Sequence, residues 1–228
     1  MNTEIDFLIH GAIWREVSET LTRLKLRPAD PNDLIGNYHL SAQWKYYEGV
    51  VDSRRVGLIT SGIGRRRTRQ ALKWLRRLRF PKRVISIGTG GALDPRMTLG
   101  QPWIGNWAAS LSNFHTEGKY DLYVPAGMEI LDAGGVITAA KPVLREKVRE
   151  QVRIMTNAHI VDMEAVAVAR WGAKHEIPVT IIKVLTDYSD EGAEREYSRQ
   201  IANASRLLSQ FCYDFIMEPD RFWPDSKA

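Results

Sequence analysis

Residues 159–190 constrain the fold of this chain more than any other stretch, because they read as two short strands with a helix between them. Apolar residues at helical spacing, with no glycine before position 172, predict a helix over 163–175. Pro178 then leads into the run 179–185, whose length and apolar character are typical of a buried strand. A strand, a helix and a strand in this order indicate an α/β fold.

Two carboxylates lie within this unit. Glu164 stands at the start of the predicted helix, and Asp187 comes directly after the second strand. Ligands of open α/β sheets bind beyond the carboxyl ends of the strands, so Asp187 is a candidate for a functional site. Each residue also has a plain structural interpretation, since Glu164 suits the positive end of a helix dipole and Asp187 can cap a strand end.

The rest of the chain alternates between strand-like and helix-like segments. We expect further strands at 5–11, 56–60, 84–87, 101–107, 135–139 and 160–162, and two short strand-like pieces within 36–51. We expect helices at 14–24, 142–155 and 193–216, and a basic helix from residue 65 that Pro81 ends. Residues 108–132 are predicted to form a mobile loop of the kind that often covers a site.

This alternation, without an internal repeat, predicts one domain over residues 1–228 with a C-terminal tail from about 218. The expected architecture has three layers, in which a mixed, twisted central sheet is flanked by helices on both faces. The single cysteine, Cys212, excludes an intrachain disulfide and offers no metal cluster. Because we find neither a signal peptide nor an 18-residue apolar run, we expect a soluble, cytoplasmic protein without a metal site.

The net charge of +5 comes largely from the basic segment 65–83. No recognised nucleic-acid motif accompanies it, so a solvated helix face is favoured and nucleic-acid binding is not expected. Membrane headgroups are a weaker alternative, because apolar residues are interleaved with the arginines. These residues are Leu72, Trp74, Leu75 and Leu78. A contact with a sister subunit is a further alternative.

Small residues follow two of the predicted strands, as SGIG at 61–64 and as GTGGALDP at 88–95. Glycine permits positive φ and lets backbone N–H groups approach a ligand closely. A simple tight connection would need glycines equally, so these blocks alone do not decide between a binding loop and a turn.

Together, SGIG, GTGGALDP, DMEA at 162–165 and LTD at 185–187 resemble the nucleoside phosphorylase superfamily, in particular its methylthioadenosine/S-adenosylhomocysteine nucleosidase branch. The segment AKPVL at 140–144 is also similar to the hopanoid-associated phosphorylases. The resemblance implies cleavage of the N-glycosidic bond of a purine nucleoside, such as a 5′-substituted adenosine. It also implies a homodimer or a larger homo-oligomer, and no cofactor.

The resemblance assigns roles to individual residues. Asp187 would protonate the leaving purine at N7, which requires a raised pKa, and Glu164 would bind the ribose hydroxyls. The implied substrate-binding residues also include Met163, Asp162, Thr89, Gly90 and Gly91. The position at which the nucleosidases stack a phenylalanine on adenine is Pro142 here, with Val143 beside it as the candidate base contact.

The nucleophile is left open by two adjacent residues. Glu16 matches the glutamate that activates water in the hydrolytic branch, whereas Arg15 matches an arginine that binds phosphate in phosphorolytic members. For phosphorolysis, inorganic phosphate would be the co-substrate, held by Arg15, Thr89 and Arg54, the last supplied across a subunit interface. Ser86 stands where bacterial purine phosphorylases carry a further phosphate-binding arginine. A non-catalytic nucleoside-binding or storage-like protein is the alternative of another class.

Overall fold

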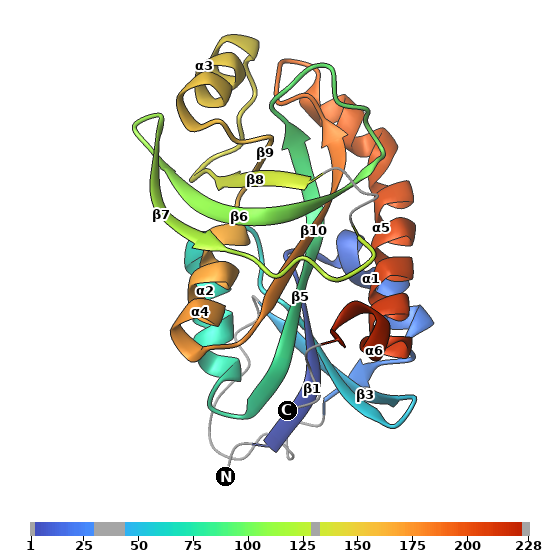
Figure 1. Cartoon of the computed structure of the whole chain (residues 1–228). Helices are drawn as coiled ribbons and strands as arrows, with labels where there is room; N and C mark the ends of the chain where they lie inside the picture. The colour runs from blue at the N-terminus through green and yellow to red at the C-terminus, as the bar shows by residue number, and fades with distance from the viewer. Residues whose placement is uncertain (1–2, 30–43, 129–132, 225–228) are drawn as a thin grey trace.

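A mixed sheet forms the centre of the molecule in this computed structural model, which describes residues 3–29, 44–128 and 133–224 (Figure 1). In this part of the chain the strands are β1 (Thr3–Gly11), β2 (Arg27–Pro28), β3 (Lys45–Val51), β4 (Arg54–Thr60), β5 (Arg79–Ala92), β6 (Pro102–Ser112), β7 (His115–Asp121), β8 (Ala133–Thr138), β9 (Ile160–Asp162) and β10 (Val179–Asp187). The helices are α1 (Trp14–Arg23), α2 (Arg65–Leu75), α3 (Glu146–Thr156), α4 (Ala165–His175), α5 (Ala193–Met217) and α6 (Pro219–Phe222).

Parallel pairing aligns the carboxyl ends of the central strands. β1 lies between β4 and β5, and β10 lies on the other side of β5, with parallel pairing at all three contacts. β6 pairs antiparallel with β10 and continues through β8 and β9 back to β5, so five strands close a ring. The ring was not expected from the sequence, although the mixed sheet was.

Helices cover both faces of the sheet, which confirms the predicted three-layer α/β fold. On one face α2 and α4 pack in a core with Leu8 and Ile181, and on the other α1 and α5 pack in a second core with Ile9 and Ile182. Successive strand residues such as Ile181 and Ile182 point to opposite faces, so apolar residues at both positions bury a strand completely. The predicted unit at 159–190 is confirmed as β9, α4 and β10.

Several predicted boundaries were wrong. The basic helix ends at Leu75, and Pro81 lies inside β5. Pairing with β10 begins only at Val84, so Pro81 has β1 as its single neighbour, where a proline is tolerated. The helix expected from residue 142 begins at Glu146, since Val143 packs in an apolar cluster and Arg145, at the N-cap, has extended dihedral angles.

The predicted loop at 108–132 is mostly a hairpin of β6 and β7, with a turn at Asn113 and Phe114. Both turn residues have positive φ, at 47° and 63°, which the sequence pattern did not signal because neither is glycine. Residues 129–132, and residues 36–43 of the predicted strand pair at 36–51, lie outside the described part of the chain.

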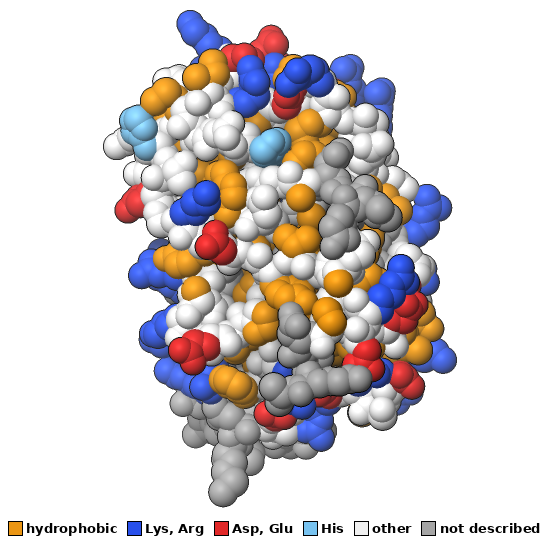
Figure 2. Space-filling model, viewed as in Figure 1, with side chains coloured by type: hydrophobic (Ala, Val, Ile, Leu, Met, Phe, Trp, Pro, Cys, Tyr) orange, Lys and Arg blue, Asp and Glu red, His pale blue; other side chains and the backbone are white. Residues whose placement is uncertain are grey.

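The apolar residues interleaved with the basic segment face the interior. All four, Leu72, Trp74, Leu75 and Leu78, are at most 9% exposed, so they offer no surface to a membrane. The outer face of α2 carries Arg66, Arg69 and Lys73, and Figure 2 shows Lys and Arg side chains along the edge where α2 and α4 lie. No helix among the described residues is long and apolar enough to cross a membrane.

The described part of the predicted tail, which ends at residue 224, forms α6 and docks on the α5 face of the sheet. Phe222 and Trp223 are both 2% exposed, and Phe222 packs edge-on against Phe215 of α5.

Candidate active site

Charged side chains from distant parts of the sequence meet where β1, β5 and β10 end. Glu16 lies in the first turn of α1, Lys183 and Asp187 lie on β10, and Glu164 caps the start of α4. The elements that carry them converge at the carboxyl edge of the parallel strands, beside the glycines of β5. This is the edge at which α/β sheets bind ligands.

Glu16 is fixed by four hydrogen bonds. Its Oε2 accepts from the backbone N–H of Ala12 (3.1 Å) and Ile13 (3.2 Å), which belong to the turn between β1 and α1. Its Oε1 accepts from both the N–H and the Oγ1 of Thr89, each at 2.9 Å. The two residues that the resemblance assigns to the nucleophile side are therefore in direct contact.

Arg15 takes no part in this contact. Its side chain is exposed, and within the described residues it forms no hydrogen bond to Thr89. Adjacent residues of a helix point about 100° apart, so in the first turn of α1 Glu16 is buried while Arg15 is exposed.

Glu164 is 7% exposed and accepts a 2.6 Å hydrogen bond at Oε1 from the N–H of Gly64. Gly64 has a φ of 102°, a conformation that favours glycine, and it links SGIG to α2. Burial raises the pKa of Glu164, and the negative charges of Asp162 and Glu16 act in the same direction, whereas Lys183 opposes them. The carboxyl group is thus poised between its charged and neutral forms.

Lys183 was not predicted, although it is the one charged residue in the apolar run of β10. Its side chain is 3% exposed, and its Nζ lies 2.9 Å from Oδ2 of Asp162. Burial alone would lower the pKa of this lysine, but Asp162, Glu164 and Glu16 together raise it, so Lys183 stays protonated. It supplies the positive charge that lets three carboxylates share one buried region.

Asp162 has a structural role. Its Oδ1 accepts from Thr138 Oγ1 at 2.7 Å, while Oδ2 accepts from the N–H of Ala165 at 2.8 Å in addition to the ion pair with Lys183. The side chain is 1% exposed, and its contact with the substrate stays a prediction. Asp162 anchors the start of α4, and with it Glu164.

We expect Lys183→Met to lower the free energy of unfolding by about 3 to 5 kcal/mol, because Asp162 would be left as an unpaired buried charge. Urea unfolding at pH 7 measures this change. Lys174→Met, on the exposed side of α4, is the control and should change stability by less than about 0.5 kcal/mol. Equal stability of the two variants would contradict the role given to the Lys183–Asp162 pair.

Asp187 is the last residue of β10. Its carboxylate accepts from Thr186 Oγ1 at 2.8 Å and from the N–H of Ser189 at 3.0 Å. Burial raises its pKa, with smaller contributions from Glu196 and Asp190, and these effects outweigh the two hydrogen bonds. A raised pKa is what a carboxylic acid needs to hold a proton near neutral pH.

The glycines of GTGGALDP lie within β5, contrary to the expectation of a loop after the strand. None of the glycines from 88 to 91 has positive φ, so conformational freedom does not explain them. A Cβ on Gly91 would lie 2.0 Å from Ser189 Oγ and 2.8 Å from Asp187 Oδ1, and one on Gly90 would lie 2.5 Å from Ile160. Gly91 is needed because Asp187 and its loop approach β5 closely, and Gly90 is needed because β9 does.

For two other predicted substrate-binding residues, the structure gives the surroundings but not a contact with substrate. Met163 is half-buried between Asp162 and Glu164, and its contact with the sugar stays a prediction. Val143 is 8% exposed and packs in an apolar cluster with Ala139 and Val161, so its contact with a base also stays a prediction.

Arg54 lies at the start of β4, whereas the candidate site lies beyond the end of that strand at Thr60. It is paired with Asp52. Within one chain Arg54 therefore does not reach Thr89, and its supply by a neighbouring subunit stays a prediction.

Tyr197 of α5 is a further residue that the sequence did not indicate. Burial raises the pKa of its phenol to about 12, Glu16 and Asp187 contribute in the same direction, and Arg15 opposes them. Tyr197 therefore lies within electrostatic range of both proposed catalytic carboxyl groups. Only the packing of α5 against α1 and β10 brings it there, so no local pattern could have identified it.

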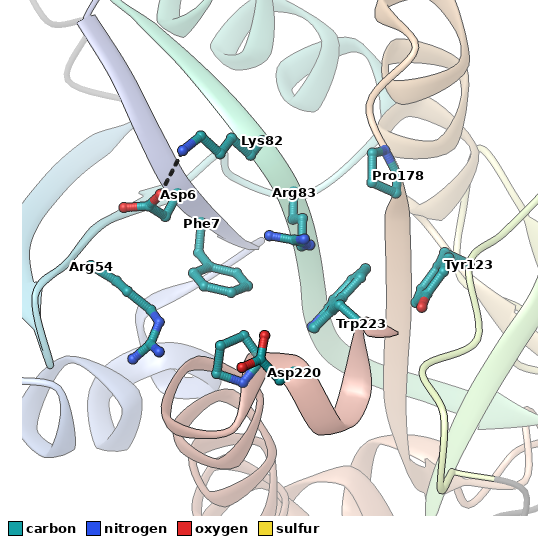
Figure 3. A pocket seen from close by; sticks show the side chains of 10 residues that line it. Asp6, Phe7, Arg54, Lys82, Arg83, Tyr123, Pro178, Asp220 and Trp223 are labelled. Atoms are coloured by element: carbon teal, nitrogen blue, oxygen red, sulfur yellow. Dashed lines mark hydrogen bonds and ion pairs between the residues drawn. The ribbon is translucent and has the colours of Figure 1, made fainter. Parts of the chain in front are cut away.

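An open cleft of about 700 Å³ lies at the opposite, amino end of the strands (Figure 3). Lys82 at its rim is paired with Asp6 at 3.1 Å. Tyr123 and Trp223 stack on each other with ring centroids 4.4 Å apart, so one face of each ring is already occupied. The cleft has no buried group with a raised pKa comparable to Glu164 among its lining residues, and we therefore assign the chemistry to the carboxyl edge.

Comparisons with known proteins agree with the α/β fold described above. The family model described as the phosphorylase superfamily matches residues 17–216. The 5′-methylthioadenosine/S-adenosylhomocysteine nucleosidase of Staphylococcus carnosus (strain TM300) is 24% identical over 198 residues, which are 77% of this chain and 87% of that protein.

Two solved structures from Helicobacter pylori share the fold. A 5′-methylthioadenosine/S-adenosylhomocysteine nucleosidase with a bound pyrrolidine compound has a TM-score of 0.80 at 14% identity, covering 95% of this chain and 98% of that one. The native structure of futalosine hydrolase has a TM-score of 0.79 at 13% identity, again covering 95% of this chain and 98% of the other.

Proposed function

Because this chain belongs to the phosphorylase superfamily, we propose that it is an enzyme that cleaves the N-glycosidic bond of a purine nucleoside and releases an adenine-type base. The observation that carries the proposal is the pair of carboxyl groups at the carboxyl edge of the sheet. Asp187 has a raised pKa, and Glu16 is held against Thr89 on the same strand that Asp187 approaches. The nucleosidase relatives support an adenosine with a 5′ substituent as the substrate.

Asp187 is proposed as the general acid. A purine leaves poorly as an anion, so a proton delivered to N7 while the bond to C1′ breaks lowers the barrier. The raised pKa of Asp187 supports this role, because burial favours its protonated form more than in a free aspartic acid. The electron pair of the broken C1′–N9 bond stays with the base.

Glu164 is proposed to bind the ribose. As the bond stretches, the sugar becomes electron-poor and resembles an oxocarbenium ion, which a nearby carboxylate stabilises. The Gly64 N–H and the positive charge of Lys183 favour the carboxylate form of Glu164 and fix it before substrate arrives, against burial and the charges of Asp162 and Glu16. Preorganised charge of this kind requires no rearrangement during the reaction.

Water is proposed as the nucleophile. Glu16 is buried beside Thr89, where it can accept a proton from a water that attacks C1′, whereas Arg15 is exposed. The products would be the free base and the free sugar, with the water oxygen on C1′ and its proton on Glu16. Phosphorolysis is the second candidate, favoured only by the nearness of Arg15 to the site, and it would require Arg54 from a neighbouring chain in a homo-oligomer.

We expect adenine release in phosphate-free buffer, at a rate that added inorganic phosphate leaves unchanged. The assay uses methylthioadenosine, S-adenosylhomocysteine, inosine and a bulky 5′-alkyl adenosine, and follows both the base and the sugar product by chromatography. A sugar 1-phosphate as product would replace hydrolysis by phosphorolysis. Tight nucleoside binding without any base release would instead support the non-catalytic alternative.

A further inference from the structure

A buried histidine lies beneath the candidate site without contacting any of its proposed catalytic groups by a hydrogen bond. His10 is on β1 and is 1% exposed. Its Nδ1 lies 3.0 Å from Ser86 Oγ of β5, and its Nε2 lies 2.9 Å from Ser61 Oγ at the end of β4. One imidazole thus joins the three central parallel strands just below the edge at which Glu16 and Glu164 sit.

The hydrogen bonds around His10 define one consistent arrangement of protons. Ser61 Oγ donates to the carbonyl oxygen of Gly62 at 2.9 Å, so its single proton is engaged. His10 Nε2–H then donates to Ser61, and Nδ1 accepts from the hydroxyl of Ser86. Burial and the charge of Lys183 lower the pKa of His10 to about 3, which keeps the ring neutral, as this arrangement requires.

The backbone of residues 61–64 connects Ser61 to the proposed ribose carboxylate. Thr68 Oγ1 donates to the carbonyl oxygen of Gly64 at 3.2 Å. In this proton arrangement its 3.1 Å approach to Ser61 Oγ is a packing contact, because both hydroxyl protons are engaged elsewhere. The same Gly64 donates its N–H to Glu164 Oε1 at 2.6 Å. The segment 61–64 is therefore held at its first residue by His10 and at its last residue by Thr68, and it presents one N–H to Glu164.

We infer that His10 is a positioning residue for Glu164 and acts through Ser61 and the backbone of Gly64. The inference rests on the proposed function of Glu164 in binding the ribose. A leucine or an isoleucine could fill the space of His10, but neither could fix the hydroxyl of Ser61, because they have no polar atom. The presence of a histidine at position 10 is therefore explained by its hydrogen bond to Ser61, which orients the segment 61–64.

The two serines that flank His10 provide a matched pair of variants. Ser61→Ala and Ser86→Ala each remove one buried hydroxyl bonded to the imidazole, but only Ser61 belongs to the segment that holds Glu164. We expect Ser61→Ala to lower kcat/KM for an adenosine substrate about tenfold. Ser86→Ala should stay within about threefold of the wild type, although both variants lose comparable stability.

The sugar of the substrate distinguishes positioning from general damage. With 2′-deoxy and 3′-deoxy analogues, one of which lacks the hydroxyl that Glu164 binds, the tenfold penalty of Ser61→Ala should shrink to about twofold for that analogue. His10→Gln, which retains polar atoms, should recover part of the activity that His10→Leu loses. An equal effect of Ser61→Ala on all three sugars would overturn the inference.

A measurement that needs no activity separates this inference from the proposed function. The amide hydrogen of Gly64 is bonded to Glu164, so it should exchange slowly with solvent in the wild type. We expect Ser61→Ala to accelerate its exchange at least tenfold and Ser86→Ala to leave it within threefold. If the wild type released no base, the proposed function would fail, while the exchange data would still test the link from His10 to Gly64; equal exchange in both variants would break that link.

Discussion

Asp187→Asn is expected to lower kcat for base release about 10³-fold, because asparagine cannot deliver a proton to N7 and general acid catalysis contributes roughly 10²- to 10⁴-fold. The measurement is adenine release under saturating substrate. Asp220→Asn, an exposed residue at the far cleft, removes the same charge and should stay within twofold of the wild type. Full activity of Asp187→Asn would remove Asp187 from the mechanism.

The same assignment fixes the sign of two pH effects. Because the protonated form of Asp187 is the active one, kcat/KM should fall as the pH rises through its raised pKa. A carboxyl group whose pKa is higher in the folded than in the unfolded protein adds to the free energy of unfolding at low pH. This contribution is lost as the pH rises through the pKa of the folded state. Asp187→Asn should therefore melt at the same temperature as the wild type or higher at pH 8, which also shows that its inactivity is not unfolding.

The parts of the fold that could be predicted are those with a local cause. The helix α4 follows from apolar residues at helical spacing, and β10 follows from a short continuous apolar run. The position of Asp187 follows from the end of that run. Pro81 misled the prediction because a proline inside a strand is tolerated only where one side lacks a partner, and the number of partners is a property of the whole sheet.

The parts of the site that could not be predicted depend on which elements become neighbours. Lys183 interrupts an apolar run visibly, but its partner Asp162 lies on another strand, and only the closed ring of strands brings the two together. The resemblance assigned Glu16 and Thr89 to the site separately, and it indicated neither their direct contact nor the four hydrogen bonds that Glu16 accepts. Close approach, rather than positive φ, explains Gly91, and this too requires the position of Ser189.

Glu16→Gln is expected to lower kcat for hydrolysis about 10³-fold, since it removes the group that accepts the proton of the attacking water. The geometry around Glu16 adds to this loss. Glu16 accepts all four of its hydrogen bonds. The amide nitrogen of a glutamine cannot accept, so it would be placed against the N–H of Thr89 or against those of Ala12 and Ile13. Glu19→Gln, exposed on the same helix, is the control and should be fully active.

Two further results separate the chemical role of Glu16 from its structural one. Glu16→Ala supplied with formate should regain part of its activity, because a small carboxylate can enter the space and accept the proton, whereas added chloride should have no effect. If Glu16→Gln instead kept its activity and became dependent on inorganic phosphate, the nucleophile would be phosphate and Arg15 would be the residue to test next. The choice between the two nucleophiles therefore depends on one buried carboxylate beside Thr89, whose partners are all donors.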